Sequence, residues 1–172
     1  VAAAGARRLG MDCHIQLEER VPRDDPVYRD SGNVLLDRIL GATLYSYPEG
    51  EDEEGADRRI VEIAQEVADR GKHPYIIPLG PGHAPLGALA YVLAAQELLD
   101  QIESEKLSID EVVVPSGSGR THGGLLFGLR ALDSEIQVTG ICVRRRATPQ
   151  RDRIRARCKE IGELLGVESQ VT

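Results

Sequence analysis

Apolar residues along the chain repeat with two alternating periods. Apolar positions three or four residues apart predict helices around 1–9, 34–40, 60–67, 86–102 and 125–132, and a last helix from Pro149 onward. Short β-branched or alternating runs predict strands over 13–17, 42–47, 75–78, 112–114 and 136–143. Strands that alternate with helices predict parallel strands joined by crossover helices, which is the α/β class. In sheets of this kind, ligands bind beyond the carboxyl ends of the strands.

Turn-forming residues set the expected bounds of several elements. Gly10, Gly41 and Gly71 each follow an expected helix at the position where a left-handed C-cap is common. The segment 18–30 is polar and contains two prolines, so it predicts a loop.

Composition narrows the class of protein. The 172 residues, 41% of them apolar, fit one domain or two small lobes with a buried core. The net charge of −7 argues against non-specific binding to nucleic acid, which needs a basic surface. No apolar segment approaches the roughly 20 residues that span a bilayer, so we expect no contact with a membrane. The three cysteines are widely spaced, which predicts neither a disulfide framework nor a zinc site and favours the cytoplasm.

Two clusters of charge have simple structural explanations. The acidic run 49–57 resembles a metal-binding cluster, but carboxylates also collect in the first turn of a helix, where they complement its dipole. The apolar stripe over 60–67 follows at helical spacing, so we expect the start of a helix and no metal site. The basic residues of 144–146 and 151–157 are expected to form a solvent-exposed helix face.

The segment 112–126, VVVPSGSGRTHGGLL, joins an expected strand to an expected helix. Its glycines allow a close backbone approach to a ligand, and the hydroxyl groups of Ser118 and Thr121 add donors. The N–H groups and the positive dipole end of the following helix favour a phosphate or a carboxylate. The spacing from Gly119 to Gly123 is one residue too long for the dinucleotide fingerprint, and no Lys-Ser/Thr pair of a Walker loop follows. A tight turn without a ligand is the alternative.

Four segments together resemble the family of D-cysteine desulfhydrase and 1-aminocyclopropane-1-carboxylate deaminase. They are the loop above, SGNVLLDRILGATLYSYPEGED (31–52), YIIPLGPGHAPLGALAYVLAAQEL (75–98) and VTGICVRR (138–145). No single one of these motifs is specific to the family. Their occurrence in this order along nearly the whole chain is specific to it. The resemblance implies a fold-type-II enzyme, with parallel sheets and flanking crossover helices in two open α/β lobes that bind pyridoxal 5'-phosphate between them. Residues 1–73 would belong to the smaller lobe, and 74–172 to the larger, cofactor-binding lobe.

The resemblance assigns the cofactor phosphate to the glycine loop. Gly117, Ser118, Gly119, Arg120 and Thr121 would hold it, in agreement with the anion site inferred from the residues. Arg120 departs from the family, in which a small residue commonly stands at this position. Its side chain either points outward and leaves the cradle intact, or points inward, where it crowds the cradle or becomes a further phosphate ligand.

The resemblance also implies a bend beside the substrate. The segment 80–83 is similar to the family's crossing between the lobes, so Gly82 and His83 are the candidate substrate contacts. An exposed loop histidine without this role is the alternative for His83. His122 receives no catalytic role.

Family chemistry requires a Schiff-base lysine in a GGNK-like motif toward the N-terminus of the enzyme. Lys72, Lys106 and Lys159 are the lysines of this chain, and none has that context. We therefore expect no catalytic residue in this chain and a Schiff-base lysine upstream of it. The chain would then be an internal fragment of a longer enzyme and inactive by itself.

The expected function is that of a pyridoxal-phosphate-dependent lyase or deaminase that acts on a small amino acid. D-cysteine desulfhydrase activity, which yields hydrogen sulfide, pyruvate and ammonia, is the first expectation. The alternatives are L-cysteate sulfo-lyase, 1-aminocyclopropane-1-carboxylate deaminase, and a non-catalytic α/β domain that binds a phosphorylated small molecule. The resemblance further implies a homodimer.

Overall fold

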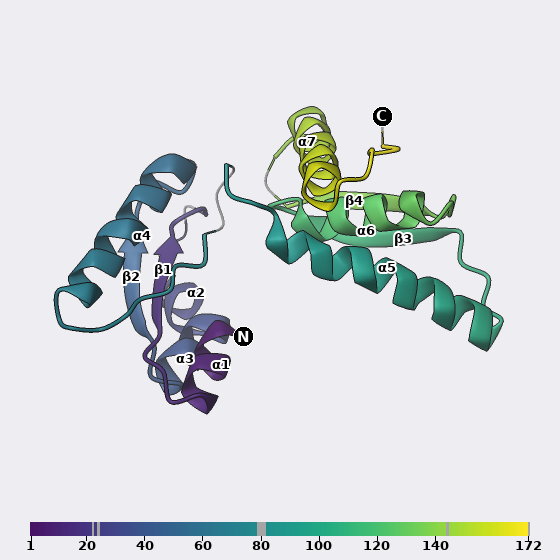
Figure 1. Cartoon of the computed structure of the whole chain (residues 1–172). Helices are drawn as coiled ribbons and strands as arrows, with labels where there is room; N and C mark the ends of the chain where they lie inside the picture. Colours follow the sequence, from purple (N-terminus) through teal and green to yellow (C-terminus); the bar gives the residue numbers. More distant parts are fainter. Residues whose placement is uncertain (22, 24, 79–81, 144, 172) are drawn as a thin grey trace. The chain divides into compact units, whose positions relative to one another are not determined.

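A computed structural model describes residues 1–21, 23, 25–78, 82–143 and 145–171 of the chain. The chain divides into two compact units, Val1–Gly82 and His83–Thr172. Each unit contains one two-stranded parallel sheet (Figure 1). The expected α/β class with parallel strands is confirmed. The assignment of the chain's two parts to a smaller and a larger lobe, with a boundary after residue 73, stays a prediction.

The described residues of the first unit form two strands and four helices. In chain order they are α1 (Ala2–Arg8), β1 (His14–Glu18), α2 (Pro26–Asp30), α3 (Gly32–Ile39), β2 (Thr43–Tyr47) and α4 (Glu53–Ala68). The two strands pair in register from His14 opposite Thr43 to Glu18 opposite Tyr47. α2 and α3 lie in the crossover between them, as a parallel pair requires.

The acidic run forms the start of α4, as its pattern predicts. Asp52 is the N-cap, and its carboxylate accepts hydrogen bonds from the Gly55 amide and the Tyr47 hydroxyl, both at 2.8 Å. These bonds hold the pKa of Asp52 below its usual value, the Gly55 amide contributing most. Glu53 and Glu54 follow in the first turn, where they complement the helix dipole. Among the described residues, no group of three or more His, Cys, Asp or Glu side chains is placed to hold a metal ion.

Two expectations for the first unit are wrong. The segment 18–30 is not a loop throughout, because α2 forms at its end with Pro26 at the first helical position and Asp25 as its cap. The segment 75–78 is not a strand, because it belongs to neither of the sheets formed by the described residues. Tyr75 and Ile77 are 85% and 62% exposed, so their apolar side chains have no layer to pack against.

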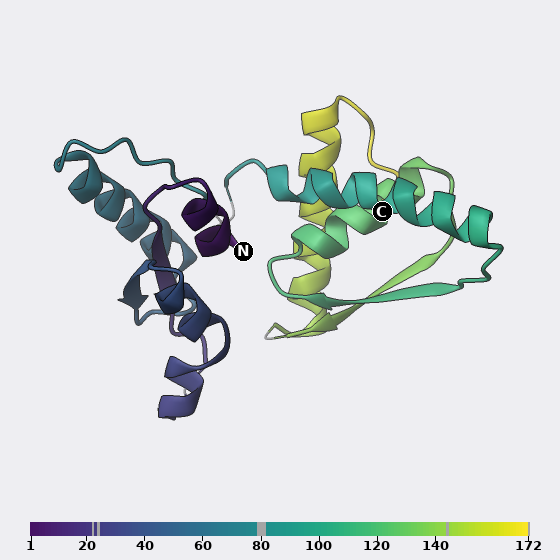
Figure 2. The ribbon, with the colours of Figure 1, turned by 90° about the horizontal axis from the view of Figure 1, so that it is seen from below.

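In the second unit, two strands and three helices are formed by the part of the chain that the structure describes. They are α5 (Leu86–Glu105), β3 (Glu111–Ser116), α6 (Arg120–Ala131), β4 (Gln137–Cys142) and α7 (Ala147–Leu165). The strands pair from Glu111 opposite Gln137 to Ser116 opposite Cys142, with α6 as their crossover helix. Figure 2 shows α6 between α5 and the two strands, and α6 also packs on α7.

α6 approaches α5 closely because glycines face the contact. A Cβ atom added to Gly124 would lie 2.4 Å from the carbonyl oxygen of Ala88, and one added to Gly128 would lie 2.7 Å from the Cβ of Ala95. The resulting core has two buried clusters, one among the three helices (Ala88, Phe127, Ile154, Cys158, Ile161) and one against β3 (Ala95, Val114, Leu125, Leu129). α6 contributes residues to both clusters, so it forms the centre of the core of this unit.

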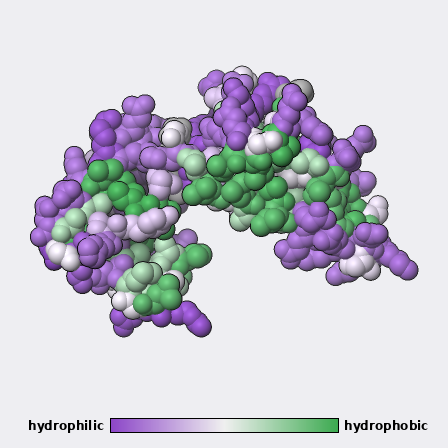
Figure 3. Space-filling model, in the orientation of Figure 1, coloured by the Kyte–Doolittle hydropathy of each residue, from purple (hydrophilic) through white to green (hydrophobic). Residues whose placement is uncertain are grey.

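Apolar side chains also reach the surface of this unit. Figure 3 shows them over α5, where Leu86 and Leu93 are 61% and 73% exposed. Val113, Ile141 and Val143 are exposed on the other face of the sheet, so the described residues cover one face of β3 and β4 only. Within the described part of the chain, no helix is both long and apolar enough to cross a membrane.

Candidate functional site

The loop 117–121 connects the carboxyl end of β3 to the first turn of α6. Gly119 is the N-cap of α6 and has a left-handed backbone, with φ of +85°. A Cβ atom there would lie 2.9 Å from Cδ1 of Ile154, and one at Gly117 would lie 3.1 Å from Cγ2 of Val143. Gly119 is therefore required by its backbone conformation, whereas a side chain at Gly117 would need Val143 to move by a few tenths of an ångström.

The carbonyl groups of this loop are bound from one side. The Gly117 carbonyl accepts hydrogen bonds from Nε2 of Gln150 at 3.0 Å and from Nη1 of Arg145 at 3.2 Å. The Ser118 carbonyl accepts one from Nε of Arg153 at 3.0 Å. All three donors lie on α7 or on the segment that precedes it, so the loop turns its carbonyls toward α7.

Within the described part of the structure, three amide groups of the loop have no such partners. Among the described residues, no acceptor binds the backbone N–H groups of Ser118, Gly119 or Thr121, and the N–H of Arg120 lies 3.5 Å from the Ser118 hydroxyl. These amides stand at the N-terminus of a 12-residue helix, where the dipole favours negative charge. The geometry supports an anion site over a tight turn without a ligand.

Arg120 extends toward the neighbouring helix. Its Cδ lies 3.9 Å from the position of a Cβ atom built on Gly87, in the first turn of α5, and its side chain is half-buried. The N-terminal ends of α5 and α6 therefore meet at this arginine.

A buried hydrogen-bond chain lies behind the loop. Ser116 and Gln150 are 1% and 3% exposed, and Nε2 of Gln150 donates to Oγ of Ser116 at 2.9 Å. The Ser116 hydroxyl can then donate its own proton to Nδ1 of His122, 3.0 Å away. This leaves the imidazole proton on Nε2 and the ring neutral. Burial lowers the pKa of His122, while a hydrogen bond to the Val138 backbone acts in the opposite direction.

This arrangement predicts that acid destabilises the fold through His122. The folded-state pKa lies below the ordinary value of 6.5, so the unfolded chain takes up a proton that the folded chain resists. The free energy of unfolding is thus expected to fall as the pH decreases from 6.5 toward the folded-state pKa. Arg151 and Arg155 of α7 line the same pocket as the ring.

Urea unfolding between pH 8 and pH 5 measures this effect. In a His122→Asn variant, which has no imidazole to titrate, the decline below pH 6.5 is expected to be shallower than in the wild-type protein. Parallel pH profiles for the two proteins would contradict the assignment.

The other candidate positions lie outside this network. Gly82 and His83 are exposed in the turn before α5, and Gly82 has a left-handed backbone with φ of +87°. Their contact with a substrate stays a prediction, and Gly80 and Pro81 of the same bend lie outside the described residues.

The lysines also lie elsewhere. Lys72 is paired with Asp12 at 3.1 Å, Lys159 lies 3.8 Å from Glu163, and Lys106 caps the C-terminal end of α5. Within the described part of the second unit, no contact of Lys106 or Lys159 with the glycine loop is found.

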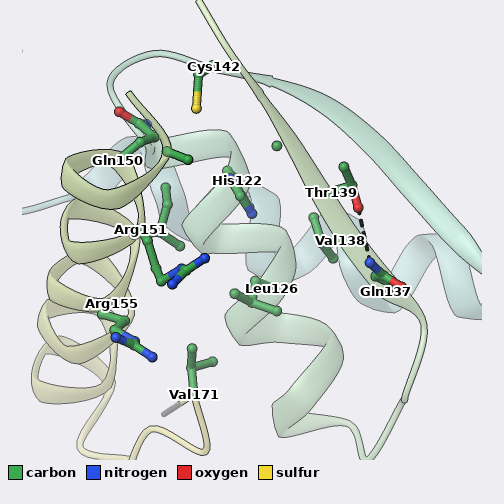
Figure 4. Close-up of a pocket in the computed structure, with 13 residues that line it drawn as sticks. His122, Leu126, Gln137, Val138, Thr139, Cys142, Gln150, Arg151, Arg155 and Val171 are labelled. Atoms are coloured by element: carbon green, nitrogen blue, oxygen red, sulfur yellow. Dashed lines mark hydrogen bonds between the residues drawn. The ribbon is translucent and has the colours of Figure 1, made fainter. Parts of the chain in front are cut away.

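A pocket of about 510 Å³ lies between β4, α6 and α7. Figure 4 shows His122 and Leu126 from α6, Thr139 and Cys142 from β4, and Gln150, Arg151 and Arg155 from α7 around it. It shares His122 and Gln150 with the hydrogen-bond chain but is not lined by 117–121. The pocket therefore lies beside the buried hydrogen-bond chain behind the loop. It is separate from the backbone amides of 117–121.

The basic run 151–157 differs from expectation in part, because Arg151 and Arg155 are exposed as expected and Arg157 is not. Arg157 is 2% exposed, forms an ion pair with Glu160, and packs beneath Gly123, so it does not lie on a solvent-exposed face. Arg153 donates to the loop, as described above. The alternation of these arginines with apolar residues is visible in the sequence. The residues around them do not indicate, however, that this side of α7 packs against the glycine loop.

Comparison with known proteins identifies the family of the chain. The model of a family described as "Pyridoxal-phosphate dependent enzyme" matches residues 1–165. A putative 1-aminocyclopropane-1-carboxylate deaminase of Pyrococcus horikoshii is 35% identical over 171 residues, which are 99% of this chain and 49% of that protein. A D-cysteine desulfhydrase of Serratia proteamaculans is 31% identical over 166 residues, 96% of this chain and 49% of that protein.

A solved structure of a related protein has a similar fold. The crystal structure of a homologue of 1-aminocyclopropane-1-carboxylate deaminase matches with a TM-score of 0.77 and 36% identity, covering 98% of this chain and 48% of that one. The chain thus spans about half the length of the relatives it matches. The expected fold and cofactor are confirmed. Because the family model covers all but the last few residues, this chain belongs to the family of pyridoxal-phosphate-dependent enzymes.

Proposed function

We propose that this chain supplies the phosphate-binding part of a lyase or deaminase that acts on a small amino acid. The observation that carries the proposal is the loop 117–121, whose carbonyls are bound from the α7 side and whose amides stand at the start of α6. A phosphate ester fits this arrangement, because it offers several acceptor oxygens and negative charge to unpaired amides and a helix dipole.

The residues of the chain would bind and orient the cofactor. Gly117, Ser118, Gly119 and Thr121 would hold the phosphate through their backbone and hydroxyl groups. Arg120 would stay outside the cradle, because its side chain extends toward α5. When bound, the cofactor ring supplies the electron sink for cleavage next to the substrate amino group.

The Schiff-base lysine is proposed to lie outside this chain, since the lysines present occupy helix ends and ion pairs at the surface. Gly82 and His83 are the proposed substrate contacts. D-cysteine was the first expectation for the substrate, and 1-aminocyclopropane-1-carboxylate is supported equally, because relatives of both kinds match the chain. L-cysteate stays a third candidate. A homodimer and a cytoplasmic location are further parts of the proposal.

The proposal is tested with the protein expressed from its complete reading frame. We expect a visible absorbance band from bound pyridoxal phosphate, and turnover of one substrate among D-cysteine, 1-aminocyclopropane-1-carboxylate and L-cysteate. Sulfide is released only from D-cysteine and sulfite only from L-cysteate, whereas ammonia without sulfide or sulfite indicates the reaction of 1-aminocyclopropane-1-carboxylate. A folded protein without the band would contradict the proposal. A protein with the band and no turnover of any amino acid would favour the non-catalytic binding domain.

A further inference from the structure

We infer that Gln150 is a positioning residue for the phosphate-binding loop: its side-chain amide holds the Gly117 carbonyl toward α7 and so keeps the loop amides turned toward the cofactor phosphate. The inference rests on the proposed function, because it concerns the loop that would bind this phosphate.

The contacts of Gln150 fully use its two donor hydrogens. Nε2 donates one to the Gly117 carbonyl at 3.0 Å and the other to Oγ of Ser116 at 2.9 Å. The Gly117 carbonyl can only accept, which fixes the nitrogen end of the amide toward the loop. The side chain is 3% exposed, so water does not readily replace these bonds when they are lost.

Because the peptide unit is planar, fixing a carbonyl group also fixes the direction of the N–H group of the next residue. In a trans peptide the carbonyl and the following N–H lie in one plane and point in opposite directions. A Gly117 carbonyl held toward α7 therefore directs the Ser118 N–H away from α7. Arg153 acts in the same way on the next peptide, because its Nε binds the Ser118 carbonyl at 3.0 Å and directs the Gly119 N–H.

The loop needs such restraint because of its composition. Gly117 and Gly119 can adopt both left-handed and right-handed backbone conformations, so the peptides between them can rotate at little steric cost. The bond from Gln150 to Ser116 also extends the restraint to α6, since Ser116 contacts His122 in its first turn. Figure 4 shows Gln150 and His122 on two helices that line the same pocket.

The test compares two ligands that differ only in the phosphate group. In the protein expressed from its complete reading frame, Gln150→Met keeps the length of the side chain and removes its donor. We expect the dissociation constant of pyridoxal 5'-phosphate to rise about tenfold. The dissociation constant of pyridoxal, which lacks the phosphate, is expected to stay unchanged. A loss of general structure would instead weaken both ligands alike.

Gln137→Met is the matched control. Gln137 lines the same pocket, but its Nε2 donates to Oγ1 of Thr139 at 3.3 Å, and the described residues show no contact between it and the loop. Both dissociation constants are expected to match those of the wild-type protein. An equal loss for both ligands in Gln150→Met, or no loss for either, would overturn the inference.

If Gln150→Met does not fold, Arg153→Lys serves as the second variant that removes a hydrogen bond to a loop carbonyl. The substitution lies on a partly exposed side chain, keeps the positive charge, and places a methylene group where the donating Nε stands. We expect an approximately fivefold loss of affinity for pyridoxal phosphate alone. A wild-type protein that binds no pyridoxal phosphate would overturn the proposed function and this inference with it. A wild-type protein that binds it, with variants that bind it equally well, would overturn the inference only.

Discussion

A Gly124→Ala variant is expected to lose about 3 kcal/mol or more of its free energy of unfolding. The added Cβ would lie 2.4 Å from the backbone oxygen of Ala88 and 2.7 Å from the Cβ of Tyr91. A backbone oxygen cannot rotate away as a side chain can, so α5 and α6 have to separate. Both buried clusters of the second unit include residues from these helices, so the separation loosens the whole core.

Gly87→Ala is the matched control for this prediction. It also replaces a helical glycine by alanine, but the nearest atom to its added Cβ is Cδ of Arg120 at 3.9 Å, an ordinary van der Waals contact. Its stability is expected to be unchanged or slightly raised, because alanine favours the helix over glycine. Urea unfolding followed by circular dichroism measures both variants. Similar midpoints for Gly124→Ala and the wild-type protein would show that the helices can adjust.

The parts of the fold that depend on local patterns could be predicted from the sequence. The acidic run and the apolar stripe after it gave the start of α4, because capping and dipole effects act within one turn. The glycine loop could be placed between a strand and a helix, because β-branched residues, glycines and helical spacing follow one another there. These signals lie within a few residues of what they determine.

Features that depend on distant partners could not be predicted in this way. The segment 75–78 has the apolar, β-branched composition of a strand, but a strand also needs a neighbour to pair with. Gln150 supports the loop from 33 positions further along the chain, and nothing in its own surroundings indicates this contact. The basic run around Arg157 has the composition of a solvated helix, and only the packing of α7 on α6 buries this side chain.

Replacing Gly119 by valine is expected to weaken the binding of pyridoxal phosphate about a hundredfold. A β-branched residue is strongly disfavoured at the φ of +85° that Gly119 adopts, and its Cβ would lie 2.9 Å from Cδ1 of Ile154. Relief of this strain requires a change in φ at the N-cap of α6. Such a change rotates the neighbouring peptides, so the amides of Gly119 and Thr121 no longer point to one place.

Gly166→Val separates the effect on the loop from the cost of backbone strain. Gly166 is the C-cap of α7, has φ of +67°, and has no atom within 4 Å of an added Cβ. Both variants are expected to lose a similar part of their free energy of unfolding to left-handed strain, about 1–2 kcal/mol. Titration of pyridoxal phosphate, followed by absorbance in the protein expressed from its complete reading frame, is expected to show weaker binding for Gly119→Val only. Equal affinities for the two variants would mean that the loop amides do not hold the phosphate, because only one of the substitutions disturbs them.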